Sequence, residues 1–125
     1  MLVDTDVLVW YLRGTPRAAE VLDQLEQFDI SVVSYMELVQ GMRSKEELRV
    51  LRSTLEAWQV GIRQIDEPTS TRAMIYVEQH FHSHALRLAD ALIAATAVEN
   101  GLPLLTANNK HYRALNDLTI EVFRP

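Results

Sequence analysis

Cysteine is absent from this sequence of 125 residues, and glycine and proline occur only four times each. Without cysteine the chain can form no disulfide framework, no thiolate nucleophile and no cysteine-ligated zinc site. The N-terminus has no basic segment followed by a long apolar run, so we expect no signal peptide. The longest apolar stretch, residues 91–98, is too short to cross a bilayer. We therefore expect a cytoplasmic protein without membrane association.

Basic residues are also in short supply. Twelve Lys and Arg residues stand against 17 Asp and Glu residues, which gives a net charge of −5 at pH 7. Proteins that bind nucleic acid through surface charge alone are usually basic, so this balance argues against that class. It leaves room for a nuclease whose acidic residues bind a metal ion. Apolar residues make up 48% of the chain, and its length fits a single domain, residues 1–125.

Short apolar or β-branched runs alternate with helical patterns along the whole sequence. We expect strands at residues 2–3, 29–33, 61–65, 104–106 and 119–122. We expect helices at residues 6–12, 17–26, 34–41, 44–58, 69–79 and 88–99, and a helical turn at 111–115. Alternation of this kind predicts an α/β fold in which helices cover both faces of a parallel sheet.

Three carboxylates, Asp4, Glu37 and Asp90, lie at or beside the predicted carboxyl edge of this sheet. Each also has a structural explanation. Asp4 can cap a helix, and Glu37 can complete a capping box that Ser34 begins. Asp90 lies in the first turn of an alanine-rich helix, and Asp6 is better explained as a first-turn acid that complements a helix dipole. Taken together, a cluster of oxygen ligands selects Mg²⁺ or Mn²⁺, ions that assist phosphodiester hydrolysis.

The four histidines form no recognisable metal motif. His80, His82 and His84 alternate in a predicted loop, and His111 stands apart. A zinc site needs at least three converging ligands, so solvated loop histidines are the favoured explanation. The sequence also contains no nucleophile elbow and no glycine-rich phosphate loop.

Four segments carry a resemblance to a known family. They are Val3-Asp4-Thr5-Asp6-Val7-Leu8, Ser34-Tyr35-Met36-Glu37-Leu38 with Gly41, Leu88-Ala89-Asp90-Ala91-Leu92-Ile93-Ala94-Ala95-Thr96-Ala97, and Leu104-Leu105-Thr106-Ala107-Asn108 with His111-Tyr112. In these segments the sequence resembles the PIN-domain family and, within it, the VapC-type toxins of toxin–antitoxin pairs. The segments occur in family order and span nearly the whole chain.

This resemblance implies a Rossmann-like α/β/α sandwich around a four- to five-stranded parallel sheet, and a Mg²⁺- or Mn²⁺-dependent endoribonuclease. Asp4, Glu37 and Asp90 match the family's catalytic, metal-binding acids. Family members often have a fourth acid near Asn108, and this departure leaves open whether one or two metal ions bind. The residues expected to support the site are Thr106, Asn108 and Asp6.

The resemblance also implies an RNA substrate, a homodimer and a VapB-type antitoxin that blocks the site. The candidates for RNA phosphate contacts are Arg13, Arg43, Arg87, Lys110 and Arg113. We favour Arg87 and Lys110, because they lie nearest in sequence to the motif residues. A leucine stripe at helical spacing is the candidate dimer face, formed by Leu48, Leu51 and Leu55. Two alternatives stay open. One is a DNA or structure-specific nuclease with a related fold, and the other is a non-catalytic binding module that has lost its metal.

Overall fold

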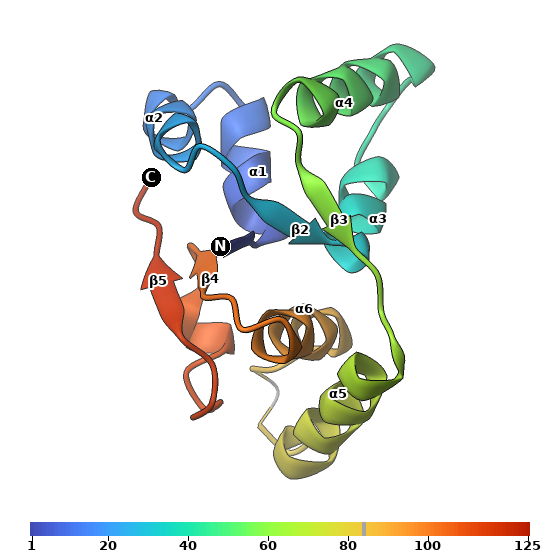
Figure 1. Ribbon diagram of the computed structural model, residues 1–125, viewed down its shortest axis with the longest axis vertical. Coiled ribbons are helices and arrows are strands. Elements are labelled where there is room, and N and C mark those ends of the chain that lie inside the picture. Colours follow the sequence, from blue (N-terminus) through green and yellow to red (C-terminus); the bar gives the residue numbers. More distant parts are fainter. Residues whose placement is uncertain (84) are drawn as a thin grey trace.

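The structure is a computed structural model that describes residues 1–83 and 85–125 (Figure 1). Its strands are β1 (Leu2–Val3), β2 (Asp29–Ser31), β3 (Gly61–Arg63), β4 (Leu104–Thr106) and β5 (Ile120–Val122). Its helices are α1 (Thr5–Leu12), α2 (Pro16–Gln24), α3 (Val32–Gln40), α4 (Lys45–Ala57), α5 (Glu67–His80), α6 (Leu88–Glu99) and the short 3-10 helix η1 (Asn109–His111). The expected elements occur in the expected order, although β2 and β3 are shorter and the helical turn comes earlier. Across the described residues, no helix combines the length and apolarity that a membrane span requires.

The five strands pair in parallel in the order β3-β2-β1-β4-β5. β1 is the central strand, and its Leu2 lies beside Asp29 of β2 and Leu104 of β4. β2 and β3 lie on one side of β1, and β4 and β5, which come later in the chain, lie on the other side. The carboxyl ends of β1, β2 and β4 therefore meet at one edge, at a switch point where open α/β sheets bind ligands. The predicted α/β class with a parallel sheet is confirmed.

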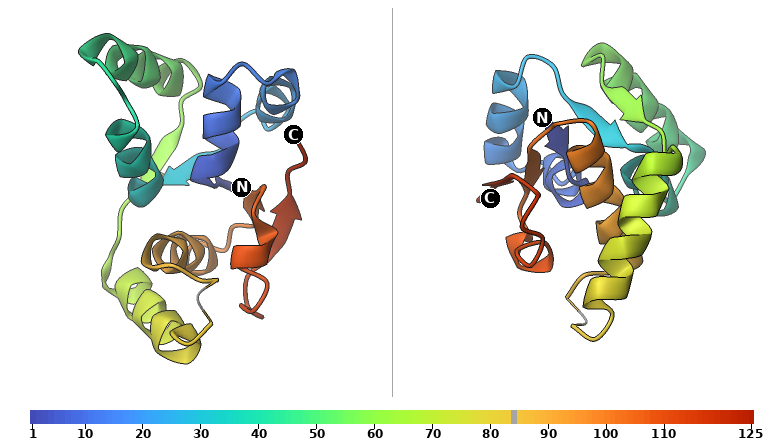
Figure 2. Two further views of the ribbon diagram at one scale, coloured as in Figure 1. Left: turned by 180° about the vertical axis from the view of Figure 1, so that it is seen from behind. Right: turned by 60° about the horizontal axis from the view of Figure 1, so that its bottom comes forward.

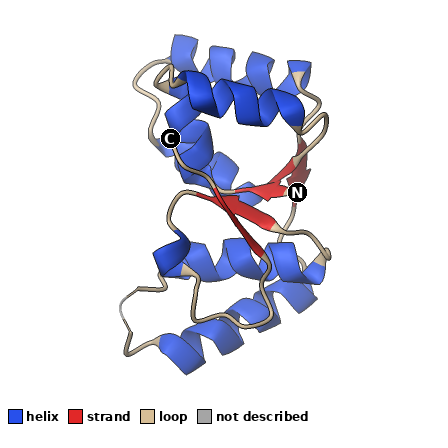
Figure 3. Ribbon diagram, turned by 90° about the vertical axis from the view of Figure 1, so that its left-hand side faces the viewer, coloured by secondary structure: helices blue, strands red, loops and turns tan. Residues whose placement is uncertain are grey.

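Helices cover both faces of the sheet (Figure 3). Alternate strand residues face opposite layers, so Leu2 and Leu104 belong to one apolar cluster while Val3 and Leu105 belong to the other. The first cluster includes residues of α5 and α6, which lie side by side in both views of Figure 2. The second includes residues of α1, α2 and α4. Burial on both faces explains why these strands are apolar runs rather than alternating ones.

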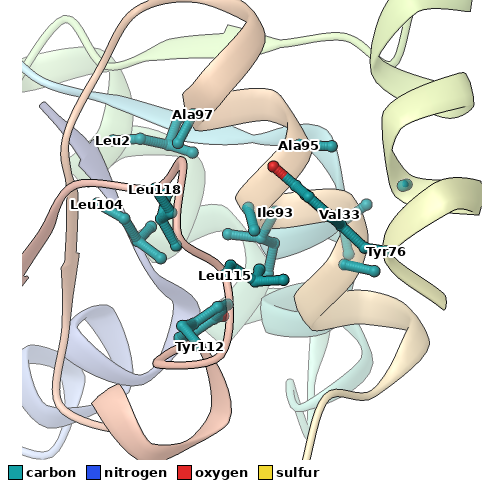
Figure 4. Packing of buried hydrophobic residues seen from close by; sticks show 13 residues of the cluster. Leu2, Val33, Tyr76, Ile93, Ala95, Ala97, Leu104, Tyr112, Leu115 and Leu118 are labelled. Atoms are coloured by element: carbon teal, nitrogen blue, oxygen red, sulfur yellow. The ribbon is translucent and has the colours of Figure 1, made fainter. Parts of the chain in front are cut away.

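The alanine-rich helix α6 has the predicted bounds, and it lies between the sheet and α5 (Figure 1). Its buried residues are mostly small, and Ala91, Ala94, Ala95 and Ala97 are completely inaccessible. Small side chains let a helix approach its neighbours closely on several sides. Figure 4 shows this layer, in which Ile93 of α6 packs near Leu115 and Tyr112. The packing fixes the N-terminal turn of α6, and with it Asp90, at the carboxyl edge of the sheet.

The start of α3 differs from the prediction. The helix begins at Val32, because the Ser31 hydroxyl accepts a hydrogen bond from the backbone N–H of Val33 at 3.1 Å and caps the first turn. Ser34, predicted as the cap, is buried inside the helix. The capping box of Ser34 and Glu37 is therefore wrong. Tertiary burial of Val33 outweighs the weak helix propensity of a β-branched residue.

The leucines of α4 form an internal contact rather than a dimer face. Leu51 and Leu55 are 2% and 6% exposed and belong to the second apolar cluster, and Leu48 packs against the same cluster. The predicted dimer face is therefore wrong, because the stripe packs within the chain's own second apolar cluster. Val50, on the opposite side of α4, is 47% exposed.

Candidate active site

A cleft of about 450 Å³ opens at the carboxyl edge of the sheet. It is lined by residues from α1, α3, α6 and the segment after β4, namely Asp4, Thr5, Asp6, Val9, Trp10, Arg13, Glu37, Arg87, Ala89, Asp90, Asn108 and His111. The three acids predicted from sequence, Asp4, Glu37 and Asp90, all line this cleft. The structure therefore brings together side chains that lie up to 86 positions apart in the sequence.

Asp4 follows β1 directly and is only 6% exposed. Its Oδ1 accepts the backbone N–H of Thr5, the first residue of α1, at 2.8 Å. Asp4 therefore caps α1 as predicted. Its Oδ2 accepts hydroxyl hydrogen bonds from Thr106 at 2.8 Å and from Tyr112 at 2.9 Å. Burial, and then the neighbouring carboxylate of Asp6, raise the pKa of Asp4 to about 7. These contacts hold a carboxylate in a place where its charge is poorly compensated.

Asp6 lies in the first turn of α1 as predicted, but its carboxylate is directed at the segment after β4 rather than at solvent. Oδ2 accepts the backbone N–H of Ala107 at 3.1 Å, and the Thr106 hydroxyl lies 3.4 Å away. Oδ1 is buried and has no hydrogen-bond partner among the described residues. Burial raises the pKa of Asp6. A buried oxygen without a donor is costly unless a ligand supplies one or coordinates it.

Glu37 projects from the second turn of α3 and accepts the Thr5 hydroxyl at 2.7 Å on Oε1. Thr5 Oγ1 also lies 2.9 Å from the hydroxyl oxygen of the buried Ser34. Glu37 is thus tied to the start of α1 and not to the start of its own helix. The short motif after β1 supplies both an acid, Asp4, and the hydroxyl that orients a second acid.

Asp90 combines a helix-end contact with a place in the cleft. Its Oδ2 accepts the backbone N–H of Arg87 at 3.0 Å, which closes the first turn of α6. Its Oδ1 lies 3.3 Å from the hydroxyl of Tyr112, and His111 Nδ1 lies 3.6 Å from Oδ2. The structural explanation and the site explanation for Asp90 are therefore compatible, because different oxygens serve each.

Two residues that sequence reasoning did not single out as site residues have clear places here. Thr5 orients Glu37, and the fully buried Tyr112 contacts both Asp4 and Asp90. Both lie inside the quoted motifs, so their positions were marked in the sequence, but their contacts could not be predicted from it. Thr106, predicted as a supporting hydroxyl, is buried and also accepts the backbone N–H of Asn108 at 3.0 Å.

The basic residues near the cleft are arginines. Arg13 and Arg87 line it, and the Arg13 guanidinium lies 6.0 Å from the ring centroid of Trp10. Lys110 is exposed and is not among the residues that line the cleft. His80 and His82 also lie outside the lining, and His84 falls outside the described residues.

The charge of the cleft is left unpaired. Among the described residues, no Lys or Arg forms an ion pair with Asp4, Asp6 or Glu37, and His111 is the only ion-pair partner of Asp90. A larger hollow of about 600 Å³ lies beside α5, but Arg72 already pairs with two of its acids, Glu99 and Asp117. The cleft at the carboxyl edge of the sheet is therefore the better candidate for binding an external cation.

The donor set fits a hard, hydrated cation. Within residues 1–83 and 85–125, no three His, Cys, Asp or Glu side chains lie close enough to form a ready-made metal cage. Mg²⁺ is usually held by one or two carboxylates and keeps several waters, so a cage is not what it requires. The partnerless Oδ1 of Asp6 and the carboxylate oxygens that line the cleft match this mode of binding.

The PIN domain family matches residues 1–116. Ribonuclease VapC10 of Mycobacterium tuberculosis (strain ATCC 25618 / H37Rv) is 37% identical over 122 residues, which cover 94% of this chain and 90% of VapC10. A toxin–antitoxin complex from Klebsiella pneumoniae is 26% identical with a TM-score of 0.80, and 94% of each chain is covered. VapBC2 from Rickettsia felis, bound to a DNA fragment from its promoter, has a TM-score of 0.85 at 17% identity over 98% of each chain, which is a likeness of fold.

Proposed function

This chain belongs to the PIN-domain family, and we propose that it is a ribonuclease toxin of a toxin–antitoxin pair that hydrolyses RNA phosphodiester bonds with a divalent metal ion. We propose further that residues 1–125 form a single PIN domain. The supporting relatives are a ribonuclease at 37% identity and a toxin–antitoxin complex at 26% identity.

One observation carries the proposal: the acids at the carboxyl edge of the sheet share a cleft and have no basic partner among the described residues apart from His111. In this proposal Asp4, Glu37 and Asp90 are the catalytic, metal-binding acids. Their unpaired negative charge would attract a cation and repel an RNA phosphate in its absence. Metal binding would therefore precede productive contact with the phosphate.

A bound Mg²⁺ or Mn²⁺ would supply Lewis-acid stabilisation of the phosphate and activation of water. The chain's own side chains prepare that chemistry. Thr106 holds one oxygen of Asp4 and Thr5 holds one oxygen of Glu37, so both acids are oriented before a ligand arrives. Loss of an orienting partner of this kind typically costs about 10- to 100-fold in metal affinity or activity. Asp6, with its buried and partnerless Oδ1, is a further oxygen donor at the same edge.

Phosphate contacts are assigned to the arginines that line the cleft. Arg87 was a candidate from sequence, and its place beside Asp90 supports that role. Arg13, also a candidate from sequence, is assigned the same role, because its guanidinium lies near the Trp10 ring at the end of α1, and the two can contact a phosphate and an unpaired base. Lys110 stays a candidate from sequence that lies outside the cleft lining.

The proposed antitoxin would act by covering these acids. A groove of about 550 Å³ lined by α1, α3 and the start of α4 adjoins the cleft and shares Val9, Arg13 and Glu37 with it. Its apolar lining, with Leu12, Leu38 and Met42, suits an amphipathic segment of a partner. A homodimer is also proposed, and exposed apolar residues of α5, rather than the buried leucines of α4, are available for it: Met74, Ile75 and Val77.

The test is RNA cleavage by the purified chain with and without a divalent ion. We expect cleavage with Mg²⁺ or Mn²⁺, none in EDTA, and a loss of at least about 100-fold for Asp90→Asn at unchanged circular dichroism. A DNA substrate in the same assay separates the ribonuclease from a structure-specific DNA nuclease. Full cleavage in EDTA, or by a folded Asp90→Asn variant, would contradict the proposed mechanism.

A further inference from the structure

Tyr112 places a single hydroxyl between two acids of the cleft. Its Oη lies 2.9 Å from Asp4 Oδ2 and 3.3 Å from Asp90 Oδ1. Asp4 follows the central strand, Asp90 lies in the first turn of α6, and Tyr112 follows η1. Among the described residues, no other side chain makes hydrogen bonds to both of these acids. The hydroxyl therefore links two parts of the fold that approach the cleft from different layers.

Packing does not explain the hydroxyl. The Tyr112 side chain is completely buried in the apolar cluster with Ile93 and Leu115, where a phenylalanine ring would fill the same space (Figure 4). Burying a hydroxyl in such surroundings is unfavourable unless it is hydrogen bonded. Burial, and then the charges of Asp4 and Asp90, raise the pKa of Tyr112, so the group stays a neutral donor. Its single hydroxyl proton lies between the carboxylates of Asp4 and Asp90, which would otherwise face each other across the cleft.

We propose that Tyr112 is a positioning residue whose hydroxyl holds Asp4 and Asp90 in one arrangement that is competent to bind a divalent cation. The inference rests on the proposed function and adds a residue to it. Tyr112 is inaccessible to solvent, so it acts through the two acids and does not touch RNA. Its loss should weaken metal binding and slow the reaction while leaving RNA binding unchanged.

Tyr112→Phe tests this directly, and Tyr76→Phe is its matched control. Tyr76 is also buried in the same cluster and donates its hydroxyl to a carboxylate, that of Asp117, at 2.8 Å, but it lies outside the cleft lining. Mn²⁺ binding is measured by calorimetry on each full chain without RNA. RNA cleavage is then measured at saturating Mn²⁺ to separate kcat from KM.

We expect Tyr112→Phe to weaken Mn²⁺ binding about tenfold and to lower kcat with KM for RNA unchanged. Tyr76→Phe should match the wild type in Mn²⁺ affinity, kcat and KM. If Tyr112→Phe matches the wild type in all three, the positioning role is overturned while the proposed function stands. If the wild type itself neither binds Mn²⁺ nor cleaves RNA, the proposed function has failed first.

A measurement on the wild-type chain covers the case in which Tyr112→Phe does not fold. Tyrosines labelled with ¹³C at the ring carbon that bears the hydroxyl report on both groups by NMR. Saturating Mg²⁺ should shift the Tyr112 resonance, because both of its acceptors become metal ligands, and should leave the Tyr76 resonance in place. An unmoved Tyr112 resonance at saturating Mg²⁺ would overturn the proposal.

Discussion

Two tyrosines of one apolar cluster bind carboxylates in opposite electrostatic settings. Tyr76 donates to Asp117, and Arg72 pairs with that carboxylate at 2.7 Å and with Glu99 at 3.1 Å. At the other place, Tyr112 contacts Asp4 and Asp90, and no arginine or lysine among the described residues pairs with either. We name these the Tyr76 cluster and the Tyr112 cluster.

The difference shows how the same chemical groups serve stability in one place and binding in another. In the Tyr76 cluster every charge has a partner, so the cluster joins α5, α6 and the segment before β5 into one body. In the Tyr112 cluster acidic side chains gather at the end of the central strand, where no Lys or Arg of the described residues pairs with them and only His111 lies near Asp90. Groups kept in an unfavourable state by the fold are typical of functional sites.

The largest difference between the two clusters should appear when one acid in each is neutralised. We expect Asp4→Asn to lower RNA cleavage at least about 100-fold, because an amide cannot replace a charged ligand of a hard cation. Asp117→Asn should lose stability but keep the wild-type rate at a temperature where it is folded. Cleavage assays at saturating Mg²⁺ on both folded variants give the result. Equal rates for Asp4→Asn and wild type would remove the functional distinction between the clusters.

The pH dependence of stability separates the clusters next. Burial and the neighbouring Asp6 raise the pKa of Asp4 to about 7 from an ordinary value of 3.8, so the folded state holds a proton that the unfolded state releases. The stabilisation from this proton is full below about pH 4 and is lost as the pH rises through 7. The metal-free protein should therefore lose on the order of 2–4 kcal/mol between pH 5 and pH 8.

Urea unfolding in EDTA across this pH range measures the effect. Asp4→Asn should reduce the dependence, since one titrating group is gone, and the raised pKa of the buried Asp6 accounts for what remains. Tyr76→Phe should keep the wild-type slope, because burial raises the pKa of Tyr76 to about 12, beyond the range tested. A flat wild-type profile would show that Asp4 does not titrate near neutral pH.

Much of the fold follows from pattern alone. The alternation of apolar strands with helical periods predicts the element order, and the expected helix at residues 88–99 matches the bounds of α6. The choice between Ser31 and Ser34 as a cap did not follow, because it depends on where β2 stops pairing with its neighbours. The burial of Leu51 and Leu55 also depends on which layer covers α4, and spacing is silent on that point.

The candidate site divides in the same way. Asp4, Glu37 and Asp90 could be predicted from their places at strand ends and in motifs, and the fold brings all three to one cleft. The contacts of Tyr112 could not be predicted, because the hydroxyl reaches a partner 108 residues away through tertiary packing. The partnerless oxygen of Asp6 is likewise a property of the folded chain.

Removing the Arg72 cation from the Tyr76 cluster should lower the stability of the folded protein without affecting activity. Arg72→Met keeps most of the apolar stem but leaves Asp117 and Glu99 without their shared partner. We expect a loss of about 1–2 kcal/mol in the free energy of unfolding, and a smaller loss at high salt, where the two acids repel each other less. The RNA cleavage rate of the folded variant should not change. A change in kcat would show that the two clusters are coupled.

The smallest expected effect concerns the cations around the Tyr112 cluster. Arg87 lines the cleft next to Asp90, whereas Lys110 is exposed outside the lining. Each substitution by alanine removes one positive charge from a chain of net charge −5, so long-range attraction of RNA falls equally in both variants. A direct phosphate contact adds a local loss, and we expect Arg87→Ala to raise KM for RNA roughly threefold to tenfold more than Lys110→Ala does.

Steady-state cleavage at two salt concentrations measures this difference. Loss of one phosphate contact also reduces the slope of log affinity against log salt concentration by about one unit. Equal KM values for the two variants would assign Arg87 no contact beyond its charge, and a larger effect of Lys110→Ala would move the RNA path to the segment after β4.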